Sequence, residues 1–441
     1  MYIERVIDKD LLDWSMAISR KPLLIRGARQ VGKSTAVRHL AEKFEFFIEI
    51  NFDEQPQYAS LFEENISIDE TIEQLSLITN TKIVEGKTLL FLDEIQACLP
   101  AISSLRYFYE RKPNLHVIAA GSLLEFALSE LPSFGVGRVR SMFVYPVSFT
   151  EFLRALNEKA LVNAIRESGA NKPLNEMVHN KLKIYLKKFL IIGGMPEVVQ
   201  TYVSNGNLLE VQRVLDDLII SIQDDFTKYK KRIPSERVKL VFDSIVQQVG
   251  MKYRYSDQHS SLTSVQIKQV IDLLEMAGLV HPVTHSSCNG VPLGAESNIK
   301  KRKYLVFDTG IFQRMLGLDV ASVLMKDDFE VVNKGNIAEL FVGLELLKSK
   351  SCFEKTALYY WHRESKNSHA EVDYVVQIQN KIIPIEVKAG TKGTMQSMFL
   401  FMEEKQSELG FRLSLENFSH YDKVRVYPLY AVSNMLENAD K

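Results

Sequence analysis

The chain has 441 residues, and at about 150 residues per domain this length predicts roughly three domains. Hydrophobic residues make up 46% and charged residues 25%, which is the composition of an ordinary soluble globular protein. The formal net charge of −1 excludes a global basic field that would draw the whole chain to nucleic acid. Any nucleic-acid contact must therefore come from a local patch.

The cysteines and the N-terminus indicate a compartment. The chain has three cysteines, far apart in sequence, which excludes a disulfide framework and fits reducing conditions. The N-terminus carries acidic residues where a signal peptide needs basic ones. The most apolar stretch, 115–124, is shorter than the about 20 residues that a membrane-spanning helix needs. We therefore expect a cytoplasmic protein that does not engage a membrane.

The first third of the chain alternates short apolar runs with amphipathic segments of helical length. Five runs are nearly continuous in apolar residues, as strands covered on both faces should be: KPLLIRGA, FFIEINF, TLLFLDEI, LHVIAAGS and SMFVYPVSF. This alternation predicts an α/β fold with a parallel sheet and helices on both of its faces. We expect this N-terminal core to span residues 1–155.

Three further parts follow. Residues 156–233 show helical periodicity, broken by the paired glycines of IIGGMPE, and predict a helical lid or linker. Residues 234–325 contain TSVQIKQVIDLLEMAGLV, whose helix, glycine turn and strand resemble a winged-helix unit. Residues 326–434 open with a predicted helix over 334–348 and continue with strands, which predicts a second α/β domain.

A glycine-rich segment follows the first predicted strand, opens the first predicted helix and matches GxxxxGK[ST]. Its residues are Gly27, Ala28, Arg29, Gln30, Val31, Gly32, Lys33 and Ser34, with Thr35 next. Glycines let backbone N–H groups approach phosphates, and a helix N-terminus adds partial positive charge. Lys33 can reach the β- and γ-phosphates, and the Ser34 hydroxyl can ligate Mg²⁺. The segment therefore predicts a nucleotide-phosphate loop.

Two acids end the third predicted strand, TLLFLDE. Asp93 can hold the water shell of a Mg²⁺ ion, and Glu94 can orient or deprotonate an attacking water. A solvated acidic strand end is the alternative. Together with the loop upstream, the pair predicts binding of ATP with Mg²⁺.

These motifs resemble those of AAA+-type ATPases. In that group a polar residue ending the next strand positions the γ-phosphate, and Ser122 lies there, although serine after a strand is also a common helix cap. Arg138 and Arg140 precede the fifth strand, where an arginine either acts as a finger on a neighbour's nucleotide or lies on the surface. A finger between subunits would require a homo-oligomer.

A second constellation lies in the last third of the chain and comprises Glu339, Asp373, Glu386 and Lys388. A turn centred on Gln379-Asn380 sets Asp373 directly opposite Glu386, with Cβ atoms about 5 Å apart. Two carboxylates at that distance repel unless a cation lies between them, and Mg²⁺ suits oxygen ligands. Lys388 could then activate or orient a water for attack on a phosphodiester. The alternative is a half-exposed hairpin whose charges face water.

This second arrangement resembles the core of restriction-endonuclease-like nucleases, the PD-(D/E)XK group, although Val372 stands where that pattern has proline. The resemblance implies that Glu339, on the preceding helix, is a further metal-side acid. Taken whole, the chain resembles a family of prokaryotic AAA-type ATPases with an uncharacterised C-terminal domain of nuclease-like fold. The features that carry this resemblance are LDEIQ, YPVSFTEF, IGGMPEVV, KYLVFDTGI and EVDYVV with IEVK.

Two basic clusters, 228–232 and 300–303, flank the segment that resembles a winged helix. They either contact DNA phosphates or form a solvated face. Two hypotheses follow for the whole chain. In the first, a Mg-dependent ATPase controls a C-terminal domain that binds nucleic acid, with or without cutting it. In the second, ATP switches the contacts of a catalytically silent platform with a protein partner or DNA.

Overall fold

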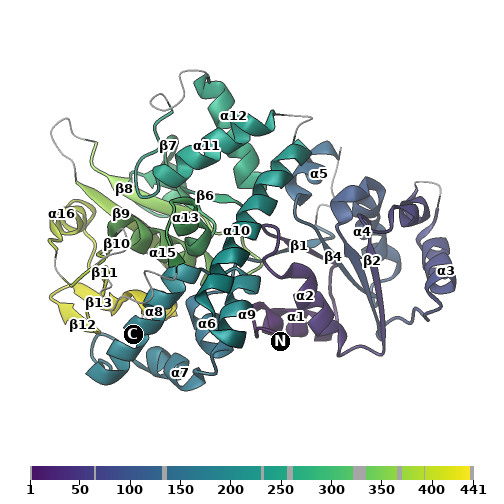
Figure 1. Ribbon diagram of the computed structural model, residues 1–441, viewed down its shortest axis with the longest axis horizontal. Coiled ribbons are helices and arrows are strands. Elements are labelled where there is room, and N and C mark those ends of the chain that lie inside the picture. The colour runs from purple at the N-terminus through teal and green to yellow at the C-terminus, as the bar shows by residue number, and fades with distance from the viewer. Residues whose placement is uncertain are drawn as a thin grey trace. The chain divides into compact units, whose positions relative to one another are not determined.

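The computed structural model falls into two compact units (Figure 1). The first comprises Met1–Pro146, Met276–Gly278 and Ser351–Lys355, and the second Val147–Glu275, Leu279–Lys350 and Thr356–Lys441. The structure describes residues 2–63, 66–131, 137–229, 233–255, 262–320, 334–364, 370–391 and 393–437. The four-part division by sequence stays a prediction, and its last boundary lies outside the described residues.

The first unit alternates strands and helices, as the sequence predicts. Its strands are β1 (Leu23–Arg26), β2 (Phe46–Asn51), β3 (Thr88–Asp93), β4 (His116–Ala120) and β5 (Arg140–Phe143). Its helices are α1 (Ile7–Met16), α2 (Lys33–Ala41), α3 (Ile68–Thr79), α4 (Leu99–Arg111) and α5 (Leu124–Glu130), with short 3₁₀ turns at Pro56–Phe62 and Ile95–Ala97. All five predicted strands are therefore confirmed.

The five strands form one parallel sheet in the order β2-β3-β4-β1-β5. Leu24 of β1 shares a buried cluster with Leu75 of α3 and Leu105 of α4. Its neighbours Leu23 and Ile25 are equally buried but lie outside that cluster, because successive side chains of a strand point to opposite faces. Helix α2 packs against β3 and β4. The expected α/β sheet with helices on both faces is confirmed.

The second unit begins with helices and continues with a mixed sheet. Its helices are α6 (Phe149–Ala155), α7 (Lys159–Glu167), α8 (Glu176–Ile192), α9 (Pro196–Asn205), α10 (Leu208–Asp225), α11 (Ser235–Gln247), α12 (Ser264–Met276), α13 (Thr309–Met315), α15 (Lys334–Lys348), α16 (Gln396–Lys405) and α17 (Val432–Glu437). Its strands are β6 (Val280–Ser286), β7 (Ser297–Val306), β8 (Leu358–His362), β9 (Glu371–Ile378), β10 (Lys381–Val387), β11 (Gly410–Ser414), β12 (Ser419–Tyr421) and β13 (Val424–Pro428).

These eight strands form one sheet in the order β12-β13-β11-β10-β9-β8-β6-β7. Strands β6 and β7 come from the segment that resembles a winged helix, and they join the C-terminal strands because β6 pairs in parallel with β8. Helix α15 packs against β7, β8 and β10, while α16 packs against β9 and β10. The sheet thus unites residues that the sequence assigns to two different domains.

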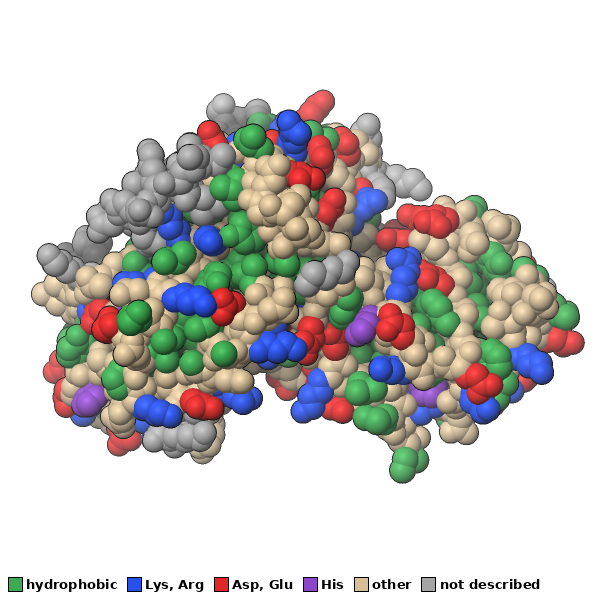
Figure 2. All heavy atoms as spheres, turned by 60° about the horizontal axis from the view of Figure 1, so that its bottom comes forward, with side chains coloured by type: hydrophobic (Ala, Val, Ile, Leu, Met, Phe, Trp, Pro, Cys, Tyr) green, Lys and Arg blue, Asp and Glu red, His purple; other side chains and the backbone are tan. Residues whose placement is uncertain are grey.

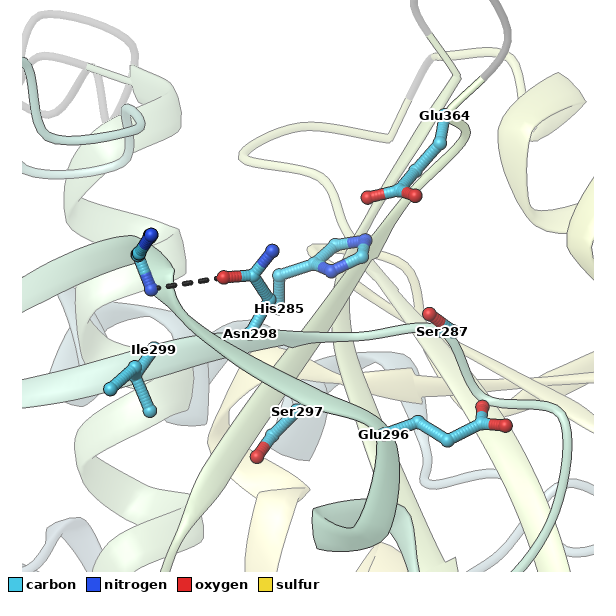
Figure 3. A pocket seen from close by; sticks show the side chains of 8 residues that line it. His285, Ser287, Glu296, Ser297, Asn298, Ile299 and Glu364 are labelled. Atoms are coloured by element: carbon cyan, nitrogen blue, oxygen red, sulfur yellow. Dashed lines mark hydrogen bonds between the residues drawn. The ribbon is translucent and has the colours of Figure 1, made fainter.

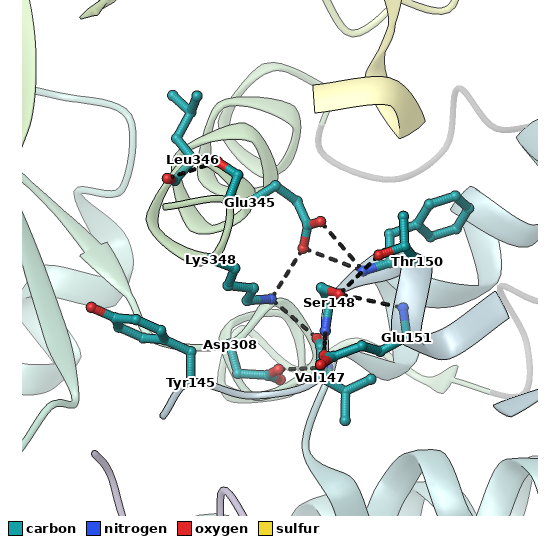
Figure 4. Close-up of polar contacts among 12 residues, drawn as sticks. Tyr145, Val147, Ser148, Thr150, Glu151, Asp308, Glu345, Leu346 and Lys348 are labelled. Atoms are coloured by element: carbon teal, nitrogen blue, oxygen red, sulfur yellow. Dashed lines mark hydrogen bonds and ion pairs between the residues drawn. The ribbon is translucent and has the colours of Figure 1, made fainter. Parts of the chain in front are cut away.

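Two of the quoted motifs, KYLVFDTGI and IGGMPEVV, meet at one buried carboxylate, Asp308 (Figure 4). Its Oδ1 accepts hydrogen bonds from the N–H groups of Gly310 (2.9 Å) and Ile311 (3.0 Å), which begin α13. Its Oδ2 accepts from the N–H of Gly194 (2.7 Å), in the paired-glycine turn. A Cβ at Gly194 would lie 2.2 Å from the carbonyl oxygen of Val147, so glycine is required for this approach. Asp308 therefore fastens the turn to α13.

A second buried acid completes this junction from α15. Glu345 accepts from the N–H of Phe149 at the start of α6 (3.3 Å), and it pairs with Lys348 (3.2 Å). The ammonium group of Lys348 also donates to the carbonyl oxygen of Val147 (3.1 Å). A carboxylate at a helix N-terminus is favoured by the partial positive charge there. The junction therefore links α6, α13, α15 and the turn before α9.

Replacing Asp308 with alanine should lower the free energy of unfolding by about 3 kcal/mol, because three buried N–H groups lose their acceptor. Urea denaturation followed by circular dichroism measures this change. Asp272→Ala, at an exposed position of α12, is the matched control and should change stability by less than about 0.5 kcal/mol. Equal stabilities of the two variants would contradict the role of Asp308.

Candidate functional site

The glycine-rich loop lies between β1 and α2, as the sequence predicts. Gly27 has φ +148°, and a Cβ there would lie 2.1 Å from the carbonyl oxygen of Val144. Gly32 has φ +91° and caps α2, which begins at Lys33. These conformations favour glycine because it lacks a Cβ. The two glycines of the motif are thus explained by the local backbone.

Lys33 folds back onto this loop. Its ammonium group donates to the carbonyl oxygens of Ala28 (2.7 Å) and Gly27 (3.1 Å), and the side chain is buried. Burial lowers the pKa of Lys33 to about 8, although Glu94 and Asp93 act in the opposite direction. The lysine is therefore held inside the loop, and the carboxylates of Asp93 and Glu94 lie close enough to favour its charged form.

The two predicted halves of the site meet at Ser34 and Asp93. Asp93 is the last residue of β3, and its Oδ2 accepts a hydrogen bond from the Ser34 hydroxyl at the start of α2 (2.7 Å). Its Oδ1 accepts from the N–H of Glu94 (3.0 Å). Burial raises the pKa of Asp93, while these hydrogen bonds lower it. The hydroxyl oxygen of Ser34 and the carboxylate of Asp93 therefore lie side by side where the phosphate loop enters α2.

Glu94 is held by a neighbour that the sequence analysis did not single out. Its backbone is left-handed, with φ +48°, and its Oε2 accepts from the side-chain amide of Gln96 (2.5 Å). The other end of that amide, Oε1, is buried without a partner among the described residues, and a Cβ at Gly121 would lie 2.0 Å from it. Gln96 thus bridges Glu94 and the end of β4, where Ser122 follows Gly121. The only sequence signal was its place in LDEIQ.

Arg138 and Arg140 lie near the amino-terminal ends of the strands, whereas the phosphate loop follows a carboxyl-terminal end. Arg140 begins β5 and pairs with Leu23, at the start of β1, whereas the phosphate loop follows the end of β1. Arg138 forms an ion pair with Glu110. The guanidinium carbon of Arg140 lies 5.3 Å from the ring centre of Phe353. Neither arginine therefore reaches the loop of its own chain.

Arg5 supports the loop and was missed by the sequence analysis. Its guanidinium donates to the carbonyl oxygen of Val31 (3.0 Å), inside the loop, and to that of Tyr145 (2.7 Å), after β5. The side chain is buried. A single arginine ahead of the first strand has no pattern that marks it, so only the fold reveals this brace.

The C-terminal hairpin has the predicted register. Residues of β9 and β10 pair from Ile378 with Lys381 through Tyr374 with Ile385, which makes Asp373 and Glu386 the next opposed positions. Asp373 accepts a hydrogen bond from the N–H of Val387 (2.8 Å). Burial raises the pKa of Asp373, against the opposing effect of nearby lysines. The predicted register of the hairpin is therefore confirmed as far as Tyr374 and Ile385, while the joint role of the two acids stays a prediction.

Glu386 already has a cation of its own. Its Oε1 accepts from the ammonium group of Lys388 (2.6 Å), while its Oε2 is buried without a hydrogen-bond partner among the described residues. Burial raises the pKa of Glu386 to about 7, and Asp373 adds to the rise. Lys388 thus lies beside the acid, as the strand spacing predicts.

Glu339 also has a cationic partner, and the sequence analysis missed it. Lys303 of β7 donates to Glu339 (2.8 Å) and to Glu371 (2.6 Å), with 1% of its side chain exposed. Burial raises the pKa of Glu339 to about 7, although Lys303 opposes the rise. Burial acts against the charge on Lys303, but Glu339, Glu371 and Asp373 raise the pKa of Lys303 well above its usual value.

In the basic cluster 300–303, one side chain is buried and two form ion pairs, while Lys300 is exposed. Lys303 is buried, Arg302 pairs with Glu275 (3.1 Å) and Lys301 pairs with Glu364. The other cluster, 228–232, lies partly outside the described residues. On the face seen in Figure 2, side chains of both charges are interspersed.

In the part of the chain that the structure describes, no group of three or more His, Cys, Asp or Glu side chains is placed to hold a metal ion. The predicted set of Glu339, Asp373 and Glu386 therefore does not form a ready metal cage. Each of the three has a partner within the protein: a lysine for each glutamate and a backbone N–H for Asp373.

A separate cavity of about 550 Å³ opens beside the β6–β7 hairpin (Figure 3). His285 and Glu364 line it together with Lys300 and Asn298, whose side-chain oxygen accepts from the Lys300 N–H (3.0 Å). Sequence patterns do not predict this cavity, because Glu364, which follows β8, is distant along the chain from the hairpin segment that supplies the other lining residues. Among the described helices, none is long and apolar enough to span a membrane.

Three segments of the chain match known protein families. Residues 19–153 match the family described as an AAA domain. Residues 183–322 and 334–432 match two domains of unknown function, DUF8612 and DUF4143. No curated protein matches the chain.

Three solved structures are similar to this chain. The Walker-type ATPase PABY2304 of Pyrococcus abyssi has 15% identity and a TM-score of 0.45, over 71% of this chain and 96% of that one. Cdc6p from Pyrobaculum aerophilum has 12% identity and a TM-score of 0.26, over 74% and 96%. The Hsp104-ADP complex of S. cerevisiae has 14% identity and a TM-score of 0.30, over 62% and 38%. Residues 19–153 thus match an AAA domain, and this segment contains the five-stranded parallel sheet and the glycine-rich loop.

Proposed function

We propose that the first unit binds ATP with Mg²⁺ and hydrolyses it. The observation that supports this most directly is the contact between Ser34 and Asp93, which joins the phosphate loop to the acidic end of β3. A hydroxyl and a carboxylate are the hard oxygen donors that Mg²⁺ prefers, so these residues fit the ion. When bound, Mg²⁺ would neutralise charge on the phosphates.

Lys33 and the loop would bind the phosphates. The ammonium group now contacts two loop carbonyl oxygens, and phosphate oxygens are stronger acceptors because they carry charge. The N–H groups of Lys33 to Thr35 lie at the start of α2, where a helix favours anions, and the loop from Gly27 to Gly32 leads directly into it. Arg5, through Val31, would keep the loop in shape while it is empty.

Glu94 would act on the attacking water, and Ser122 would contact the γ-phosphate from the end of β4. The sheet order supports both roles, because β4 lies between β1 and β3 and so brings the three strand ends together. We further propose that Arg138 or Arg140 acts on the nucleotide of a neighbouring subunit. Arg140 lies at the start of β5, opposite the start of β1 and away from the loop of its own chain, which supports a role toward a neighbouring subunit in a homo-oligomer.

Glu94→Gln should preserve ATP binding and lower kcat by about 10²–10⁴-fold, because the amide cannot accept the proton of the water. Fluorescent-nucleotide titration and phosphate release measure the two quantities. The matched control is Glu73→Gln, at an exposed position of α3, which should hydrolyse ATP like the wild type. Equal turnover by both variants would show that Glu94 does not orient or deprotonate the water.

Gln96 should act as a positioning residue for Glu94. Losing a hydrogen bond to a charged group costs about 1.5–3 kcal/mol, so Gln96→Ala should lower kcat by about 10- to 100-fold with little change in ATP affinity. Gly121→Ala should act similarly, because its Cβ would displace the Gln96 side chain. The control is Gln57→Ala, an exposed glutamine. An unchanged kcat in Gln96→Ala would limit Gln96 to a structural role.

For the second unit, we propose a platform whose contacts with a partner depend on the nucleotide state. The specific observation that favours a catalytically silent platform is that Glu339 and Glu386 are already paired with Lys303 and Lys388. A nuclease that acts through these residues is the competing function.

We therefore expect no cleavage of DNA or RNA by the wild-type protein with Mg²⁺ or Mn²⁺. Gel electrophoresis of labelled single- and double-stranded substrates measures this directly. Cleavage that disappears in both Asp373→Ala and Lys388→Ala would establish the nuclease and contradict the platform. Cleavage that persists in both variants would point to a contaminating enzyme.

A further inference from the structure

Lys303 lies where a nuclease-like site would need a cation. The lysine extends from β7 across the sheet, and its ammonium group lies 5.3 Å from the ring centre of Tyr360 on β8. It ends between Glu339 of α15 and Glu371 of β9, at 2.8 and 2.6 Å. One ammonium group thus joins a helix and two non-adjacent strands of the sheet.

The surrounding packing closes this position from two sides. A Cβ at Gly343 would lie 2.4 Å from the hydroxyl of Tyr374, so α15 approaches β9 closely at this glycine. The Tyr374 hydroxyl donates to the carbonyl oxygen of Glu339 (2.7 Å), which fixes the helix. A Cβ at Gly250 would lie 3.3 Å from Oε2 of Glu339, so the chain after α11 covers the acid.

Because this cluster is buried, its negative charges need positive partners close by. Several carboxylates out of water repel one another unless a cation neutralises them, and an unpaired buried charge is strongly destabilising. Lys303 supplies that cation within the protein. A second ammonium group, that of Lys252, lies 3.8 Å from the carboxylate of Glu371. On the other side of Asp373, Lys388 neutralises Glu386.

We propose that Lys303 replaces a metal ion. Its ammonium group occupies the cation position between the carboxylates of Glu339 and Glu371, so the wild-type protein holds no divalent cation there. The inference rests on the platform proposed above and explains it physically. It also disagrees with the metal-side role that the nuclease resemblance implies for Glu339. Lys303 is thus a positioning residue that holds α15 on the sheet.

The test is Mn²⁺ binding to nucleotide-free protein, measured by calorimetry and by the electron paramagnetic resonance of free Mn²⁺. Lys303→Ala removes the ammonium group and leaves space beside Glu339 and Glu371, so it should bind one Mn²⁺ more per chain than the wild type. Adding Glu371→Gln to this variant should abolish the extra site. Lys303→Met removes the charge but fills the space, so it should gain no site.

A matched control separates this site from the nucleotide site. Lys301→Ala removes a lysine of the same strand whose ion pair with Glu364 is exposed, so its Mn²⁺ binding should equal that of the wild type. Any Mn²⁺ held near Ser34 and Asp93 is common to all these variants and cancels in the comparison. Neither ATP turnover nor nucleic-acid cleavage enters the readout, so failure here is distinguishable from failure of the proposed function.

Stability gives a second readout. Loss of the charge partner in Lys303→Ala should lower the melting temperature of the second unit by roughly 5–10 °C, and Mn²⁺ should restore part of it. A folded Lys303→Ala protein that gains no Mn²⁺ would overturn the proposal. If that variant does not fold, Mn²⁺ binding is compared between the wild type and Glu339→Gln. Equal binding supports the proposal, and loss of a site in Glu339→Gln overturns it.

Discussion

Charges that leave water must find partners, and this constraint shapes both units of the protein. Asp308 shows it most clearly, because its buried carboxylate accepts hydrogen bonds from α13 and from the paired-glycine turn. Glu345 and Lys348 extend the same junction to the start of α6. Segments more than 100 residues apart are held together because only their combined donors satisfy these acids.

The same constraint gives the two candidate sites opposite characters. In the AAA-type domain, Asp93 is partnered by a serine hydroxyl and a backbone N–H, both neutral groups. Neither of these partners neutralises its negative charge. In the second unit, Glu339 and Glu386 are partnered by full positive charges from lysines. A site left negative attracts a cation, whereas a site already neutralised gains little from one.

The sequence predicted the features that depend on local pattern. Strand and helix order in the first unit follows from apolar periodicity, and the loop from Gly27 to Ser34 from glycine spacing. Even the pairing of β9 with β10 was predictable, because a two-residue turn fixes the register of a hairpin. The burial of Lys303 was not predictable. A lysine within a basic run has the same sequence pattern whether it faces water or a buried carboxylate.

By itself, then, the sequence determined the phosphate loop, the acidic strand end and the α/β class, because each is written in residues close along the chain. Only the tertiary structure decided that β6 and β7 complete the C-terminal sheet and that Gln96 holds Glu94. It alone decided that Lys303 neutralises Glu339. These outcomes depend on which distant side chains share a buried space, and spacing along the chain does not encode that distance.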